Sequence, residues 1–137
     1  MPVQLATRPE IDDAALSRLH ARAFGGPCVL QPWRKRLCEH SLTWVGARDG
    51  RDGLVGFVNV AWDGGAHAFV LDLVVDPDHQ RRGLGEVLVE RAAREAATAG
   101  CQWLHVDFEA HLGPFYLDTC GFQPTAAGLL RLDERSP

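Results

Sequence analysis

The stretch DPDHQRRGLGE at residues 76–86 places two arginines and two glycines between an apolar run and a predicted helix. The first N–H groups of a helix have no acceptor within the helix, and its macrodipole is positive there. Glycine allows a ligand to approach the backbone closely and readily adopts positive φ. This arrangement predicts an anion site suited to phosphate. Its loop residues are Gln80, Arg81, Arg82, Gly83, Leu84 and Gly85.

Two familiar phosphate loops do not fit this stretch. A P-loop requires Gly-Lys-Ser/Thr, which is missing, and a dinucleotide fingerprint requires a third glycine where Leu88 stands. The remaining alternative is a tight turn in which Arg81 and Arg82 are solvated and bind nothing.

Hydrophobic periodicity predicts the elements that hold the loop in place. Residues 68–76 are apolar on both faces, as in a central strand, and Pro77 ends them. Residues 83–99 have helical spacing, and residues 101–109 form the next strand. The other predicted elements are strands 3–7, 42–49, 54–64 and 127–132 and helices 8–25, 31–40 and 113–122. The predicted order is βααβββαβαβ, an α/β fold with a mixed sheet.

Composition narrows the class of protein. The length of 137 residues predicts one domain over 1–137, and the net charge of −4 argues against a nucleic-acid partner. No apolar run is long enough to span a bilayer, and residues 1–13 lack the layout of a signal peptide, so we expect a cytoplasmic protein without membrane contact. The four cysteines form no metal-binding pattern; we expect reduced, buried thiols and no metal.

Residues 74–96, VVDPDHQRRGLGEVLVERAAREA, resemble the acyl-coenzyme A motif of the GNAT acetyltransferase superfamily, which is Val-x-Pro-x-x-(Gln/Arg)-x-x-Gly-x-(Gly/Ala) after a central strand. Downstream, FYLDTCGF is similar to the family's Tyr-x-x-x-Gly-Phe, with four residues rather than three between the tyrosine and the glycine. The positions in register with the two motifs are Val75, Pro77, Gln80, Gly83 and Gly85, and Tyr116, Gly121 and Phe122.

This resemblance implies a GNAT-like mixed β-sheet flanked by helices, with acetyl-CoA as co-substrate. It implies that the N–H groups of residues 80–85 hold the pyrophosphate. It also implies that the backbone of Leu73, Val74 and Val75 pairs with the pantetheine arm, at an edge opened where strands 68–76 and 101–109 splay apart. The pantetheine arm carries two amides, which need such an unpaired sheet edge.

Acetyl transfer to an amine needs a proton acceptor for the ammonium and a proton donor for the departing thiolate. Tyr116 occupies the position that the family's motif assigns to the group facing the sulfur, and a phenol is protonated at neutral pH and able to donate. The resemblance therefore implies Tyr116 as general acid. The alternative is an aromatic residue that packs beside Phe115 and Phe122.

The sequence offers several candidates for the general base, whereas it offers one for the general acid. Strand alternation places Trp103, His105, Asp107 and Glu109 on one face, and Glu109 at the end of that row is the first candidate. The next candidates for the base are Asp72, which interrupts an apolar strand, and His105. A structural hydrogen-bonding role is an alternative for each of these residues. Many family members are thought to use ordered water instead.

The function expected from the resemblance is N-acetyl transfer from acetyl-CoA to a primary amine by direct attack in a ternary complex. The acceptor stays open among a small amine, an amino acid and a protein N-terminus or lysine. The alternative is an inactive CoA-binding sensor or partner module, which Ala110 keeps open because an asparagine often stands there in the family. Family members often dimerise through late strands, so a homodimer is a further expectation. Aromatic residues that could line the acceptor pocket are Phe24, Trp33, Trp44, Phe57 and Trp62.

Overall fold

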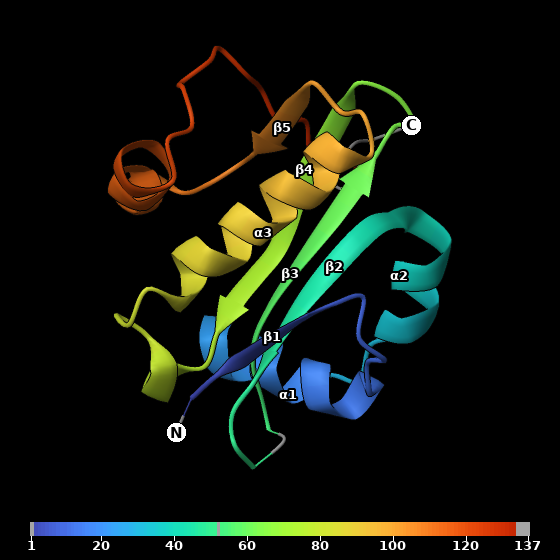
Figure 1. The fold of residues 1–137 in the computed structure, drawn as a ribbon, viewed down its shortest axis with the longest axis vertical. Coiled ribbons are helices and arrows are strands. Elements are labelled where there is room, and N and C mark those ends of the chain that lie inside the picture. Colours follow the sequence, from blue (N-terminus) through green and yellow to red (C-terminus); the bar gives the residue numbers. More distant parts are fainter. Residues whose placement is uncertain (1, 52, 134–137) are drawn as a thin grey trace.

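A five-stranded sheet with the strand order β1-β2-β3-β4-β5 forms the centre of the computed structural model, which describes residues 2–51 and 53–133 (Figure 1). Neighbouring strands from β1 to β4 are antiparallel, and β4 and β5 are parallel. The strands are β1 (Gln4–Thr7), β2 (Ser41–Arg48), β3 (Leu54–Trp62), β4 (His67–Val75) and β5 (Trp103–Val106). The predicted mixed sheet is confirmed.

Helices cover both faces of the sheet. The helices are α1 (Asp13–Phe24), α2 (Trp33–His40) and α3 (Leu84–Thr98). Buried residues of α3 join one core cluster with alternate residues of β2, β3 and β4, whereas α1 and α2 share a second cluster with Trp44, Phe57 and Val74 (Figure 1). Since successive strand residues point to opposite faces, the two clusters lie on opposite sides of the sheet.

Local signals determine where α1 begins and ends. The Asp12 side chain caps the helix by accepting a hydrogen bond from the Ala15 N–H at 3.1 Å, and Gly25 follows the last turn with φ 79°. Both features satisfy backbone groups or geometry that the helix interior cannot. The helix therefore starts at Asp13, five residues after the start of the predicted range.

A β-bulge interrupts β4 beside its partner β3. The register shifts between Phe57 and Asn59, so that β4 carries one residue more than β3 over this interval. Asp72 lies within the bulge and has φ 56°, a left-handed conformation that non-glycine residues rarely adopt. A bulge changes the direction of the side chain that it carries, which makes this point of β4 different from the rest of the strand.

The parallel strands β4 and β5 separate halfway along β4. They are paired from His67 to Val70 and from Trp103 to Val106, after which β5 ends and β4 continues to Val75. The predicted strand 101–109 is thus only four residues long, since the chain leaves the sheet where the bulge begins. The splay expected from the resemblance is confirmed, and it leaves one edge of residues 71–75 without a strand partner.

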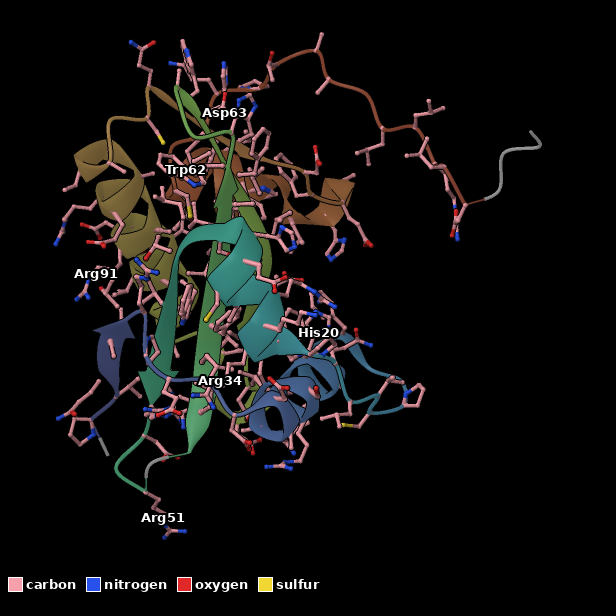
Figure 2. All side chains as sticks on the ribbon, turned by 90° about the vertical axis from the view of Figure 1, so that its right-hand side faces the viewer. His20, Arg34, Arg51, Trp62, Asp63 and Arg91 are labelled. Atoms are coloured by element: carbon pink, nitrogen blue, oxygen red, sulfur yellow. The ribbon has the colours of Figure 1, made fainter. Side chains whose placement is uncertain are left out.

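The predicted last strand over residues 127–132 is wrong. These residues are exposed and form no strand, and Figure 2 shows the chain beyond the last helix running away from the sheet. A groove of about 1160 Å3 is lined by β5, by α3 and by residues 119–125 and Ala127. A strand requires a neighbouring edge for its backbone hydrogen bonds, so three leucines in an apolar pattern do not suffice. Those leucines are Leu129, Leu130 and Leu132.

Candidate active site

The loop after β4 is anchored by an ion pair with α1. The Arg22 guanidinium donates two hydrogen bonds to Asp76, with Nε–Oδ2 at 3.0 Å and Nη2–Oδ1 at 3.2 Å. Asp76 also accepts from the Asp78 N–H at 2.9 Å, at the start of a 3-10 turn over Pro77–His79. Burial alone would raise the pKa of Asp76, but the hydrogen bonds and positive charges around it lower that pKa below its usual value. The start of the loop is therefore held against α1.

The N-terminus of α3 has the features of a phosphate cradle. Gly83 is its N-cap, with φ 80° and ψ 7°, and no side chain caps the first turn. A Cβ added to Gly83 would meet nothing within 4 Å, so its backbone borders open space. Arg81 also has positive φ, at 64°, and both Arg81 and Arg82 are exposed. Free helical N–H groups beside two guanidinium groups fit a pyrophosphate.

Glycine is required at the two motif positions for different structural reasons. Gly83 provides the left-handed backbone that turns the loop into the helix. Gly85 provides space, because a Cβ there would lie 3.2 Å from Cζ of Phe115. The second glycine of the motif therefore brings α3 close to the segment that carries Tyr116.

The free edge of β4 leads directly to this cradle. The Asp76 N–H donates to Val55 of β3 at 2.8 Å, so by strand alternation the backbone groups of Val75 and Leu73 face away from β3. Val74 instead directs its backbone toward β3, opposite Phe57. The Gln80 side chain donates to the Val75 carbonyl at 3.2 Å and links the edge to the loop. Leu73 and Val75 are therefore the residues whose backbone an extended ligand would meet.

Tyr116 lies in an aromatic cluster beside the start of α3. Its ring stacks on Phe108 with centroids 5.0 Å apart and meets Phe115 and Phe122 edge-on at 4.9 and 5.9 Å. Desolvation by burial, followed by the influence of Cys120, raises the pKa of its phenol above 10. The hydroxyl therefore keeps its proton through the neutral range.

The helix that carries Tyr116 accommodates the extra residue of its motif. Residues Pro114–Thr119 form a π-helix, closed by a hydrogen bond of 2.9 Å from the Cys120 N–H to the Phe115 carbonyl. A π-turn contains one residue more than an α-turn. The fourth residue between Tyr116 and Gly121 is thus absorbed by the local winding, and Tyr116 is still only 7% exposed. The predicted short helix is confirmed in shortened form.

A chain of polar side chains crosses the sheet at the bulge, on the face covered by α1 and α2. Ser41 donates to Oδ1 of Asn59, and Nδ2 of Asn59 donates to Oδ2 of Asp72 at 3.3 Å. Nε2 of His20 lies 3.5 Å from the other oxygen, Oδ1 of Asp72. Figure 2 labels His20 on α1. Sequence reasoning selected Asp72 but missed the other three members of this chain, because they come from three different elements and share no motif.

The other candidates for the base lie apart from this chain. Glu109 follows the end of β5, is exposed, and has its ion pair with His111 at 3.5 Å. His105 contacts Nδ1 of His67 through its Nε2 at 2.8 Å and stacks on Phe69. Of the predicted row of four residues only Trp103 and His105 lie on the strand, because β5 ends before Asp107.

The five aromatic residues proposed for an acceptor pocket divide into two groups. Trp33, Trp44 and Phe57 are buried in the core beneath α1 and α2. Phe24 is 64% exposed and Trp62 36%. Only the exposed pair is accessible to a ligand, and of these two Phe24 lies beside His20, with ring centroids 4.6 Å apart.

Within residues 2–51 and 53–133, no group of three or more His, Cys, Asp or Glu could hold a metal ion. None of the helices in that part of the chain is long and apolar enough to cross a membrane. All four cysteines are free; Cys28 and Cys38 are exposed, which corrects the expectation of buried thiols. Cys28 lies between α1 and α2, and Cys38 lies in α2.

The Acetyltransferase (GNAT) family profile matches residues 13–122, which include the loop, the free edge and Tyr116. The chain belongs to this family. The splayed sheet and the loop at α3 are thus parts of a GNAT acetyltransferase fold, in a family that uses acetyl-CoA.

Individual relatives agree with this assignment. The chain is 40% identical over 67 residues to a mycothiol acetyltransferase of Cellulomonas flavigena, covering 49% of this chain and 19% of the relative. It is 31% identical over 109 residues to a chloroplastic serotonin N-acetyltransferase 2 of Oryza sativa subsp. japonica, covering 77% of this chain and 54% of the relative. The chain thus spans about a fifth of the mycothiol acetyltransferase and about half of the serotonin N-acetyltransferase.

Solved structures show the same fold at low identity. A probable acetyltransferase of unknown function from methicillin-resistant Staphylococcus aureus superimposes with a TM-score of 0.80 at 20% identity, covering 96% of this chain and 99% of that one. A GNAT family acetyltransferase from Streptococcus pneumoniae has a TM-score of 0.77 at 23% identity, covering 98% and 100%.

Proposed function

We propose that this protein is an N-acetyltransferase that transfers the acetyl group of acetyl-CoA to a primary amine by direct attack in a ternary complex. The observation that carries the proposal is the continuity between the free edge of residues 71–75 and the uncapped N-terminus of α3. An extended substrate with amides in its arm and phosphates at its end matches this combination.

The chain's own groups divide the binding between them. The backbone of Leu73 and Val75 pairs with the amides of the pantetheine arm, and the first N–H groups of α3 bind the pyrophosphate. The exposed Arg81 and Arg82 add positive charge next to that site. Gln80 keeps the loop against the end of β4 through its bond to the Val75 carbonyl.

Tyr116 donates the proton that the departing thiolate takes. Its raised pKa keeps the phenol protonated at neutral pH, and its place next to the first turn of α3 follows from the contact between Phe115 and Gly85. The three surrounding aromatic rings fix the position of the phenol ring. Proton donation at this point is worth roughly 10²–10⁴-fold in rate.

The acceptor amine approaches from the face of the sheet on which α1 and α2 pack. The carboxylate of Asp72 lies on that side and is 27% exposed, which suits an incoming ammonium group. The name of the relative from Oryza sativa, a serotonin N-acetyltransferase, supports acetylation of nitrogen. The alternative of a CoA-binding module without turnover makes the opposite prediction for thiol release.

Calorimetric titration with acetyl-CoA, combined with an assay of thiol release, tests the proposal. We expect micromolar binding that weakens strongly for S-acetylpantetheine, which lacks the pyrophosphate. We expect thiol release with at least one amine among 2-phenylethylamine, glucosamine, lysine and an alanine-terminated peptide. Binding without thiol release for any amine would support the non-catalytic module, and absence of binding would remove the co-substrate itself.

A further inference from the structure

We propose that His20 is the group that accepts the proton of the acceptor's ammonium, and that Asp72, Asn59 and Ser41 are positioning residues acting through it. This inference rests on the proposed N-acetyltransferase function and adds to it a catalytic residue on α1. Three observations carry it: the polar chain at the bulge, the left-handed backbone of Asp72 and the partial exposure of the imidazole.

The backbone of Asp72 is held in an unfavourable conformation that orients its side chain. Its φ of 56° lies in the left-handed region, which is unfavourable for a residue with a Cβ. Such conformations persist where the surrounding structure enforces them, and they are concentrated at functional sites. Here the bulge places a carboxylate at the point where β4 loses its partner β5.

Asn59 and Ser41 determine which oxygen of Asp72 remains available. Asn59 is only 4% exposed, and its amide nitrogen occupies Oδ2 of Asp72. The Ser41 hydroxyl donates to the amide oxygen of Asn59, which sets the orientation of the amide. Oδ1 of Asp72 is consequently the oxygen that faces His20, at 3.5 Å from Nε2.

The imidazole of His20 is fixed on one side and accessible on the other. Its ring lies 4.6 Å from Phe24 and 5.3 Å from Trp33, both at tilted angles, while the side chain is 33% exposed. A neutral imidazole that directs Nε2–H toward a carboxylate has its lone pair on Nδ1. Among the described residues, no hydrogen bond to Nδ1 is found, so that lone pair is available to a substrate proton.

An imidazole suits the task better than a carboxylate. General bases work best when they titrate near the operating pH, and imidazole ordinarily titrates at about 6.5 against about 4 for a carboxyl group. Charged side chains on three elements, β4, α1 and α2, belong to the surroundings of His20. Asp72 of β4 faces it, Arg22 of α1 is paired with Asp76, and Arg36 of α2 stacks on Trp33 at 4.8 Å.

The proton balance of the reaction is then complete. The ammonium gives one proton to His20, which passes it to water, and the neutral amine attacks the thioester carbonyl. The C–N bond forms, the tetrahedral intermediate breaks the C–S bond, and Tyr116 gives a proton to the thiolate. The nitrogen loses a second proton as the amide forms, which replaces the one that Tyr116 gave. One proton is released in total.

The test compares His20→Gln and His20→Asn with a matched control, His40→Gln. His40 lies at the end of α2, is mostly exposed and pairs with the neighbouring Glu39. The amine of the proposed panel that wild type acetylates fastest serves as probe. We expect each His20 variant to lower kcat at pH 7 by about 10²-fold, with acetyl-CoA affinity within twofold of wild type.

The pH profile distinguishes proton transfer from a structural role. The loss in the His20 variants should shrink as pH rises toward the pKa of the amine, because the amine then deprotonates without help. Added imidazole should restore part of the rate. Asp72→Asn should show a smaller loss with the same pH trend. Addition of the probe amine to wild type should also shift the His20 ring signals in NMR and leave those of His40 unchanged.

Several outcomes would overturn the assignment. A His20→Gln variant with wild-type kcat and pH profile rejects His20 as the base, and a 10²-fold loss found in Glu109→Gln instead moves the role to Glu109. If wild type binds acetyl-CoA but acetylates no amine, the proposed function fails first, and that result is distinct because it appears in wild type. If the His20 variants do not fold, unshifted His20 signals in wild type are sufficient to reject the inference.

Discussion

Replacement of Gly83 by alanine separates the strain of the loop from its contact with phosphate. Gly83 has φ 80°, and an added Cβ would touch nothing within 4 Å. The substitution therefore creates no clash, and its effect on folding is the cost of placing an L-residue in the left-handed region, about 1 kcal/mol. For a chain of this length that corresponds to a fall in Tm of roughly 4 °C.

Gly64 provides a matched control for this strain. It also has φ 80° and open space around the Cβ position, but it lies in the hairpin between β3 and β4. Gly64→Ala should lower Tm by a similar amount. If the backbone of Gly83 meets the pyrophosphate, only Gly83→Ala places a methyl group between them, and its affinity for acetyl-CoA should fall by about tenfold, or about 1.4 kcal/mol.

Thermal unfolding and calorimetry of both variants provide the two readouts. A loss of affinity confined to Gly83→Ala, together with equal losses of Tm, is the expected result. Equal acetyl-CoA affinity in the two variants would falsify the phosphate contact. Unchanged Tm in both would contradict the left-handed backbone on which the magnitude rests.

Three further predictions concern Tyr116, Cys120 and the pair of Asp76 with Arg22. Tyr116→Phe should lower kcat by about 10²-fold and leave acetyl-CoA affinity unchanged, and an unaltered rate across pH would exclude the phenol as acid. Burial, and next to it Glu86, raises the pKa of the Cys120 thiol to about 11, so only about one in 10⁴ molecules carries the thiolate at pH 7. A thiol reagent should therefore label the exposed Cys38 well before Cys120. The Cys120→Ala variant should retain turnover, and a variant without turnover would point to an acetyl-cysteine intermediate. Because the pKa of Asp76 is lowered in the fold, its stabilising contribution is present above about pH 4 and lost as pH falls through that lowered value. Arg22→Gln should accordingly be less stable than wild type at pH 7, with a difference that narrows in acid; a constant difference down to pH 2 would refute the pairing.

The loop and its flanking elements were predictable because their signals are local. Pro77 ends a strand wherever it stands in one, glycine permits left-handed backbone, and the spacing of apolar residues after Gly83 allows one helical face. For Gly85 the sequence did not show the packing reason for a glycine, because a Cβ there would crowd Phe115, which lies thirty residues away in the chain.

Predictions of strands were less successful where the strand depends on pairing with a neighbouring strand of the sheet. Residues 127–132 have the composition of a strand but do not pair with the outer edge of β5, the last strand of the sheet. Residues 107–109 leave the sheet where β4 begins its bulge. The bulge was not predictable either, because Asp72 reads as an ordinary interruption of an apolar run. Its register depends on how β3 lies against β4.

The sequence by itself determined the family motif, the order of the elements up to Tyr116 and the glycine-rich start of α3, because residues close together in the chain encode each of them. Only the tertiary structure decided that His20 and Asn59 meet at Asp72 and that Ser41 donates to Asn59. It also decided that a π-turn keeps Tyr116 in place despite its altered spacing. Contacts between distant elements depend on sheet register and helix packing, and no local pattern specifies these.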